Sequence, residues 1–130
     1  MLDPHDTIVA IATPAGRGGI GVVRLSGPDA LEIASRLFVG DVRLEPRRAT
    51  FVRIRSARPS GAPRVTDEAI VTWFPSPRSY TGQQVVEISA HGSPVILEGI
   101  VRSAVSGGAR LARRGEFTLR AFLSGARDLV

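Results

Sequence analysis

Hydrophobic residues recur at two spacings along the chain, and these spacings predict both strands and helices. Alternating or β-branched runs predict five strands, at 7–13, 20–26, 49–55, 67–74 and 84–91. Apolar faces with a helical period predict three helices: one from Ser26 or Gly27 to Gly40, one from Ser93 or Pro94 to about Ser106, and one beginning near Gly115. A short extended piece, 109–112, lies between the last two helices. The order strand, strand, helix, three strands, helix, helix predicts an α+β fold with a mixed sheet of about five strands.

A glycine-rich stretch separates the first two predicted strands. Gly16, Gly18 and Gly21 match the G-x-G-x-x-G spacing of dinucleotide-binding proteins, but that motif requires a helix directly after the glycines. Here the chain continues as Val-Val-Arg-Leu at 22–25, a strand-like run that begins with two β-branched residues and so predicts a strand instead. The sequence contains no lysine, so a phosphate-binding G-x-x-x-x-G-K-[ST] loop is also excluded.

Length and composition predict a globular chain with a single domain over residues 1–130. An apolar content of 43% supports one core, and no apolar run reaches the ~20 residues of a membrane span. The N-terminus lacks the form of a signal peptide, so we expect a cytoplasmic protein with no membrane partner. The absence of cysteine excludes disulfides and thiolate nucleophiles, and His5 and His91 by themselves do not make a zinc site.

The net charge of +5 leaves two interpretations open. All 17 basic residues are arginine. They fit solvated loops and helix ends, or a surface for RNA or another anionic ligand. For an RNA surface, exposed aromatic residues between the arginines are missing from the pattern, and Tyr80 is the one that we expect to be available.

Two charged residues stand on predicted strands among apolar neighbours. Arg24 is an edge-strand arginine that reaches solvent, or it is a cation that needs a partner or a cleft. Glu87 lies on a solvated strand face, or it is a half-buried carboxylate suited to a ligand edge with two N–H donors. His91 at a strand end fits a structural or acid–base role, the Tyr80–Gly82 turn offers hydroxyls for turn bonds or a ligand, and Glu116 favours a helix start.

Four segments, taken together, resemble the N-terminal domain of the MnmE (TrmE) tRNA modification GTPases. They are DTIVAIATPAGRGGIGVVRLSG at 6–27, FPSPRSYTG at 74–82, VVEISAHG at 85–92 and GARLARRGEFTLRAFLSG at 108–125. The resemblance extends over nearly the whole chain. It implies a folate-binding domain similar to half of the aminomethyltransferase folate domain, which forms a homodimer with 5-formyltetrahydrofolate or a related folate bound near the subunit interface.

The resemblance also implies roles for particular residues and for the larger protein. The folate contacts correspond to Arg24 and Glu87, and a third, a lysine in the family, corresponds to Ala126. The parent type acts with an MnmG-type partner on the wobble uridine of tRNA, using a folate one-carbon unit. GTP, magnesium and potassium belong to a GTPase domain that, with a helical domain, is absent from this chain. We therefore expect no GTP hydrolysis and no catalytic residue in this chain alone.

The chain departs from the family pattern at several positions near the expected folate site. Ser124 replaces an asparagine and Ala126 the lysine, while Arg127 supplies a cation one residue later. The family's RPGEF reads RRGEF at 113–117, its acidic pair after TG reads Gln83–Gln84, and its HGG reads HGS at 91–93. These changes put the folate affinity in question but not the fold.

Two other functions remain open. One is an arginine-rich RNA-binding module without folate, for which salt-dependent tRNA binding would be the sign. The other is a freestanding folate-dependent one-carbon transferase domain, which would need a catalytic base and a second half-domain.

Overall fold

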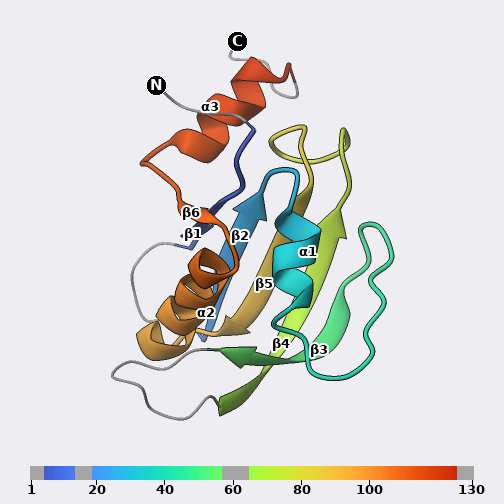
Figure 1. Ribbon diagram of the computed structural model, residues 1–130, viewed down its shortest axis with the longest axis vertical. Helices are drawn as coiled ribbons and strands as arrows, with labels where there is room; N and C mark the ends of the chain where they lie inside the picture. Colours follow the sequence, from blue (N-terminus) through green and yellow to red (C-terminus); the bar gives the residue numbers. More distant parts are fainter. Residues whose placement is uncertain (1–4, 14–18, 57–64, 126–130) are drawn as a thin grey trace.

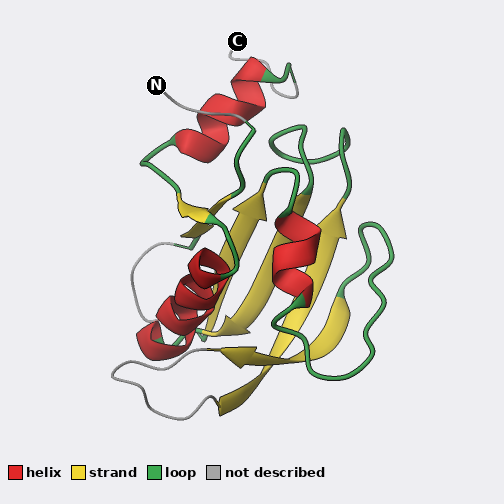
Figure 2. Ribbon diagram, in the orientation of Figure 1, coloured by secondary structure: helices red, strands yellow, loops and turns green. Residues whose placement is uncertain are grey.

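The computed structural model describes residues 5–13, 19–56 and 65–125 and shows a six-stranded sheet with three helices (Figures 1 and 2). The strands are β1 Ile8–Ile11, β2 Ile20–Ser26, β3 Thr50–Ser56, β4 Val65–Phe74, β5 Val85–His91 and β6 Arg110–Leu111. The helices are α1 Ala30–Ser35, α2 Pro94–Ser106 and α3 Glu116–Leu123. The sheet order is β3-β4-β5-β2-β1-β6.

The sheet is mixed, which confirms the predicted α+β class and the predicted order of elements. All neighbouring strands are antiparallel except β6, which is parallel to β1. The strand count is six rather than about five, because the short extended piece joins the sheet. Arg110 N–H donates to the Thr7 carbonyl at 2.8 Å and Ala112 N–H to that of Val9 at 2.9 Å. A two-residue strand carries no periodicity of its own, so its pairing depends on a distant partner.

The first helix is much shorter than its apolar pattern predicts. It was expected to extend to Gly40 but ends at Ser35. The following residues instead pair with β3: Val39 N–H donates to the Arg53 carbonyl, and Arg55 N–H to that of Leu37, both at 2.8 Å. Leu37 and Phe38 therefore reach the core from a turn and an isolated bridge to Ile54, because tertiary hydrogen bonds outweigh local helix propensity there.

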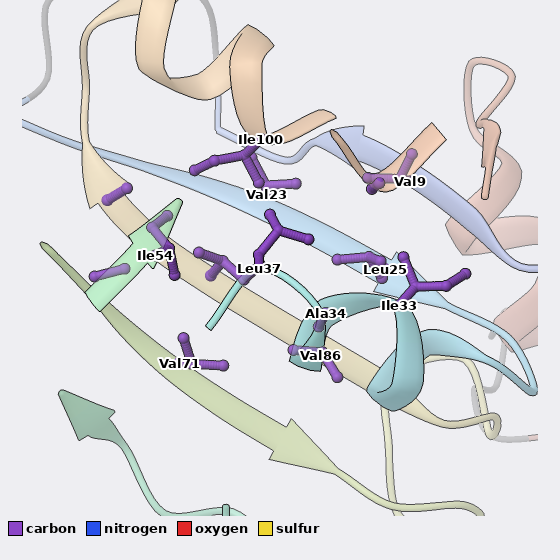
Figure 3. Close-up of a cluster of buried hydrophobic side chains, with 14 of the residues drawn as sticks. Val9, Val23, Leu25, Ile33, Ala34, Leu37, Ile54, Val71, Val86 and Ile100 are labelled. Atoms are coloured by element: carbon purple, nitrogen blue, oxygen red, sulfur yellow. The ribbon is translucent and has the colours of Figure 1, made fainter. Parts of the chain in front are cut away.

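Helices α1 and α2 cover one face of the sheet and enclose the core (Figures 1 and 3). One face of β5, made of Val86, Ile88 and Ala90, points into this core and is buried. Strands β2, β3 and β4 contribute Val23, Leu25, Ile54 and Val71, and the helices add Ile33, Ala34 and Ile100. Burial of these side chains fixes which face of each strand looks outward.

The strand after the glycine-rich stretch confirms that this segment is not a dinucleotide-binding turn. Strand β2 begins at Ile20, with no helix at that point. Gly21 has a packing role, because a Cβ there would lie 2.3 Å from Leu97 of α2. Gly16 and Gly18, like residues 57–64, lie outside the described residues.

None of the helices in the described ranges combines the length and apolarity needed to span a membrane.

Candidate functional site

Arg24 and Glu87 form an ion pair on the face of the sheet that α1 and α2 leave open. They are direct neighbours across the β2–β5 pair. Arg24 Nε and Nη2 both lie 2.8 Å from Glu87 Oε2, and the two side chains are about a quarter exposed, at 26% and 28%. The alternative of an edge-strand arginine is wrong, because β2 lies between β5 and β1. The two charged strand residues therefore satisfy each other.

One oxygen of the Glu87 carboxylate, Oε1, remains available to accept hydrogen bonds. Both Arg24 contacts go to Oε2, and within the described parts of the chain no donor contacts Oε1. An ionised carboxylate has about four lone-pair sites. Glu87 can therefore hold Arg24 and accept a ligand donor at the same time.

Two aromatic rings flank the guanidinium group of Arg24. Its Cζ lies 5.3 Å from the ring centroid of Tyr80 and 5.7 Å from that of Phe117 on α3. Tyr80 also shares a hydrogen bond of 2.9 Å with the Thr118 hydroxyl. The predicted turn at 80–82 thus makes a side-chain contact with α3, and a cation is fixed between two π-faces.

A pocket of about 310 Å³ opens at Arg24. Its walls come from β1, β2, the loop that contains Tyr80, and the segment leading into α3. They combine small apolar, aromatic and cationic side chains, and the lining residues are Ala10, Ile11, Ala12, Arg24, Tyr80, Ala112, Arg113, Arg114, Gly115, Phe117 and Thr118. None of these described residues is an acid or a histidine. The pocket can therefore hold a planar ring and an anionic group, but it offers no general base from this chain.

A second arginine–carboxylate cluster fixes α3 next to the pocket. Glu116, at the start of α3, is 1% exposed and accepts hydrogen bonds from Arg110 at 2.7 and 3.0 Å. Arg120, 4% exposed, also approaches Glu116 and pairs with Asp6. Arg110 binds Asp6 as well, at 2.6 Å. The cluster joins the N-terminal segment, β6 and α3, and its two cations balance its two carboxylates.

These contacts shift the acidities of the cluster in the direction expected for paired charges. Hydrogen bonds from Arg110 lower the pKa of Glu116 and the pKa of Asp6 below their usual values of 4.5 and 3.8, against the opposing effect of burial. The same bonds raise the pKa of Arg110. Asp6, Glu116 and Arg110 are therefore ionised at neutral pH.

Polar residues from the segment after β4 extend this cluster. Gln83 Oε1 accepts hydrogen bonds from Arg120 at 3.1 Å and from the buried Ser26 hydroxyl at 3.0 Å. Ser124, where the family has asparagine, donates to the Thr81 carbonyl at 2.6 Å and so attaches the end of α3 to the same segment. Both departures from the family pattern thus have structural partners here.

Sequence reasoning missed most of this cluster. Glu116 was interpreted as a helix start, and Asp6, Arg110 and Arg120 were given no role. The spacing of Glu116 and Arg120 by four residues was an available signal for one contact. The contact between Arg110 and Glu116 spans six residues, and those of Asp6 with Arg110 and Arg120 join residues more than one hundred positions apart, for which the sequence gives no pattern.

Other predicted residues lie away from the pocket or outside the description. His91 is exposed at the end of β5, where it lines a second hollow of about 460 Å³ over the open sheet face. Ala126 and Arg127 lie outside the described residues. The expectation that Tyr80 would be the available aromatic residue is wrong, because Phe51 and Phe122 are 59% and 47% exposed. Phe51 points outward because its strand alternates around the buried Val52 and Ile54.

Comparison with known proteins identifies the family. A family model described as the GTP-binding protein TrmE N-terminus matches residues 7–126. The chain is 51% identical over 125 residues to a tRNA modification GTPase MnmE of Legionella pneumophila (strain Corby), covering 96% of this chain and 27% of the relative. It is 52% identical over 124 residues to the protein of that name from Xanthomonas campestris pv. campestris (strain B100), covering 95% of this chain and 26% of the relative. The corresponding protein of Francisella philomiragia subsp. philomiragia is 53% identical over 125 residues.

The chain thus spans about a quarter of the length of these curated relatives, over the segment that the family model describes. The match includes all the described strands and helices, which form the framework that carries Arg24, Glu87 and the pocket. This chain belongs to the family of the GTP-binding protein TrmE N-terminus.

Proposed function

We propose that this chain is a tetrahydrofolate-binding and homodimerising domain of a tRNA modification GTPase. In the full-length protein, acting with an MnmG-type partner, it would present a folate one-carbon unit for modification of the wobble uridine of tRNA. The curated relatives are named tRNA modification GTPases, which supports the general role. GTP hydrolysis with magnesium and potassium is assigned to a further domain of such a protein.

The observation that carries the folate assignment is the environment of Arg24. The Arg24 guanidinium lies near the rings of Tyr80 and Phe117 at the wall of a pocket and is paired with the Glu87 carboxylate. A pterin is planar and aromatic and has an edge with two N–H donors, which a carboxylate recognises. Glu87 Oε1 would accept those donors while Oε2 holds Arg24. When bound, the folate would supply the one-carbon unit, and this chain would supply binding and orientation.

Homodimerisation is supported by apolar side chains on the open sheet face. Ile20, Phe51 and Ile70 are 67%, 59% and 41% exposed and surround the hollow next to His91. Phe51 and Ile70 are direct neighbours across β3 and β4. An exposed apolar group of this kind is typical of an interaction surface. Sedimentation of the chain with and without folate would test the dimer; a strict monomer under both conditions would contradict this part of the proposal.

Titration calorimetry with 5-formyltetrahydrofolate tests the site. We expect Glu87→Gln to weaken binding by about tenfold or more, because the variant loses charge-assisted hydrogen bonds to the ligand edge. Glu98→Gln, an exposed glutamate on α2, is the matched control and should bind as the unmodified chain does. Unchanged affinity in Glu87→Gln, or no folate binding in the unmodified chain, would refute the folate assignment.

One observation supports the alternative of an RNA-binding module. Phe51, Arg53 and Arg55 share the outward face of β3, which combines an exposed ring with two cations. Salt-dependent tRNA binding without folate binding would favour this function. The one-carbon transferase alternative gains no support, since the described residues that line the pocket include no candidate base.

A further inference from the structure

Two exposed arginines, Arg113 and Arg114, stand at the rim of the pocket next to Arg24. The charge of Arg24 is offset by Glu87, and the charges of Arg110 and Arg120 are offset by Asp6 and Glu116. No carboxylate in the described part of the chain pairs with the guanidinium group of Arg113 or Arg114. The rim therefore carries two positive charges that the surrounding side chains do not neutralise.

The backbone that carries these arginines is fixed by the buried cluster. Arg113 N–H donates to Glu116 Oε1 at 2.9 Å, and Glu116 N–H donates to the Arg113 carbonyl at 3.0 Å. Gly115 closes the turn at a φ of 74°, which favours glycine. Because Glu116 is buried and held by Arg110, the turn keeps both rim arginines at the pocket mouth although their side chains are in solvent.

The pocket is large enough to enclose only part of a folate, so the rest of the ligand must extend out of it. A volume of about 310 Å³ is at the lower end of the range for small-molecule sites. A ring system fits such a volume, and the remainder of a folate must cross the rim. That remainder ends in glutamate, whose carboxylates are the anionic part of the molecule.

We propose that Arg113 and Arg114 bind the carboxylates of the folate tail and give the site a preference for folates with several γ-linked glutamates. This inference rests on the proposed folate function and adds the ligand's chemical form. Arg114 is notable because the family pattern has proline at this position, so the second rim cation is a feature of this chain. Each added glutamate places another carboxylate near these two arginines, and the opposite charges attract.

The test compares two ligands on the same protein, the monoglutamate and the triglutamate of 5-formyltetrahydrofolate, by calorimetry on the 130-residue chain. We expect the triglutamate to bind about three- to tenfold more tightly at low salt, and the difference to shrink at high salt. The double variant Arg113→Gln/Arg114→Gln should bring the ratio of the two affinities close to one. Arg114→Pro, which restores the family residue, should lower the ratio part of the way.

Arg102→Gln is the matched control, since it removes an exposed cation from α2, away from the pocket lining. It should leave the affinity ratio unchanged. Equal affinities in the unmodified chain, or a ratio that survives the double variant, would overturn the inference while leaving folate binding intact. Absence of binding by either ligand would overturn the proposed function and this inference with it. Circular dichroism of each variant confirms that a changed ratio does not reflect unfolding.

Discussion

The two arginine–carboxylate clusters of this chain differ in burial and in what surrounds them. The Asp6–Arg110–Glu116–Arg120 cluster contains two nearly inaccessible charged side chains, and each of its carboxylates is held by two arginines. The Arg24–Glu87 pair is about a quarter exposed, its arginine lines a pocket, and one oxygen of its carboxylate is left available. A largely buried network in which both carboxylates are paired stabilises one arrangement of the chain, whereas a partly exposed pair beside a cavity can exchange partners with a ligand. Arginine and carboxylate side chains thus stabilise the fold in the first cluster, whereas in the second their arrangement suits ligand binding.

The largest expected effect comes from removing the buried carboxylate. Glu116→Gln leaves Arg120 buried with a weaker partner, so we expect the free energy of unfolding to fall by about 3 kcal/mol. Glu87→Gln should lower it by less than about 1 kcal/mol, because that pair is hydrated. Urea unfolding of both variants measures the difference. Equal losses would show that the two clusters do not differ in the way that their burial indicates.

A second effect comes from the backbone beside the buried cluster. A Cβ at Gly27 would lie 2.5 Å from Thr7 Cα and 2.7 Å from the carbonyl oxygen of Asp6, which accepts a hydrogen bond from Arg120. Gly27→Ala should therefore destabilise the fold by about 2 kcal/mol or more. Gly40→Ala is the control: its φ is also positive, but no atom lies within 4 Å of the added Cβ. Its loss should be about 1 kcal/mol, from backbone strain alone. A milder effect at Gly27 than at Gly40 in thermal unfolding would contradict this packing argument.

The smallest effect concerns acid stability. Because the pKa values of Glu116 and Asp6 are lowered in the folded chain, their contribution is complete above their unfolded values near 4.5 and 3.8. It is lost as the pH falls through the lowered folded values, with a slope of at most about 1.4 kcal/mol per pH unit for each carboxylate. Unfolding free energies between pH 6 and pH 3 should show this decline. Glu116→Gln should show a shallower decline, and Glu87→Gln serves as the comparison. An identical slope in Glu116→Gln would mean that Glu116 does not drive the acid response.

Much of the fold, and the Arg24–Glu87 part of the candidate site, could be predicted from the local sequence pattern. The bounds of β2 and α2 were predicted within a residue, because alternation and a 3.6-residue period are local properties. Arg24 and Glu87 stood out because each is a charge among apolar strand residues, and the structure places them side by side. The roles of Arg24, Glu87 and Ala126 in folate binding stay predictions.

The sequence by itself determined the class of fold, the family and the two unusual strand charges, since these depend on residue types at short spacings. The tertiary structure alone decided the end of α1, the pairing of β6 and the partners of Arg110 and Arg120. Those features join segments that are distant in the sequence, such as Asp6 and Arg120, so no local period records them. It also decided that Arg24 lies on an interior strand at a pocket, because strand order results from how the elements pack.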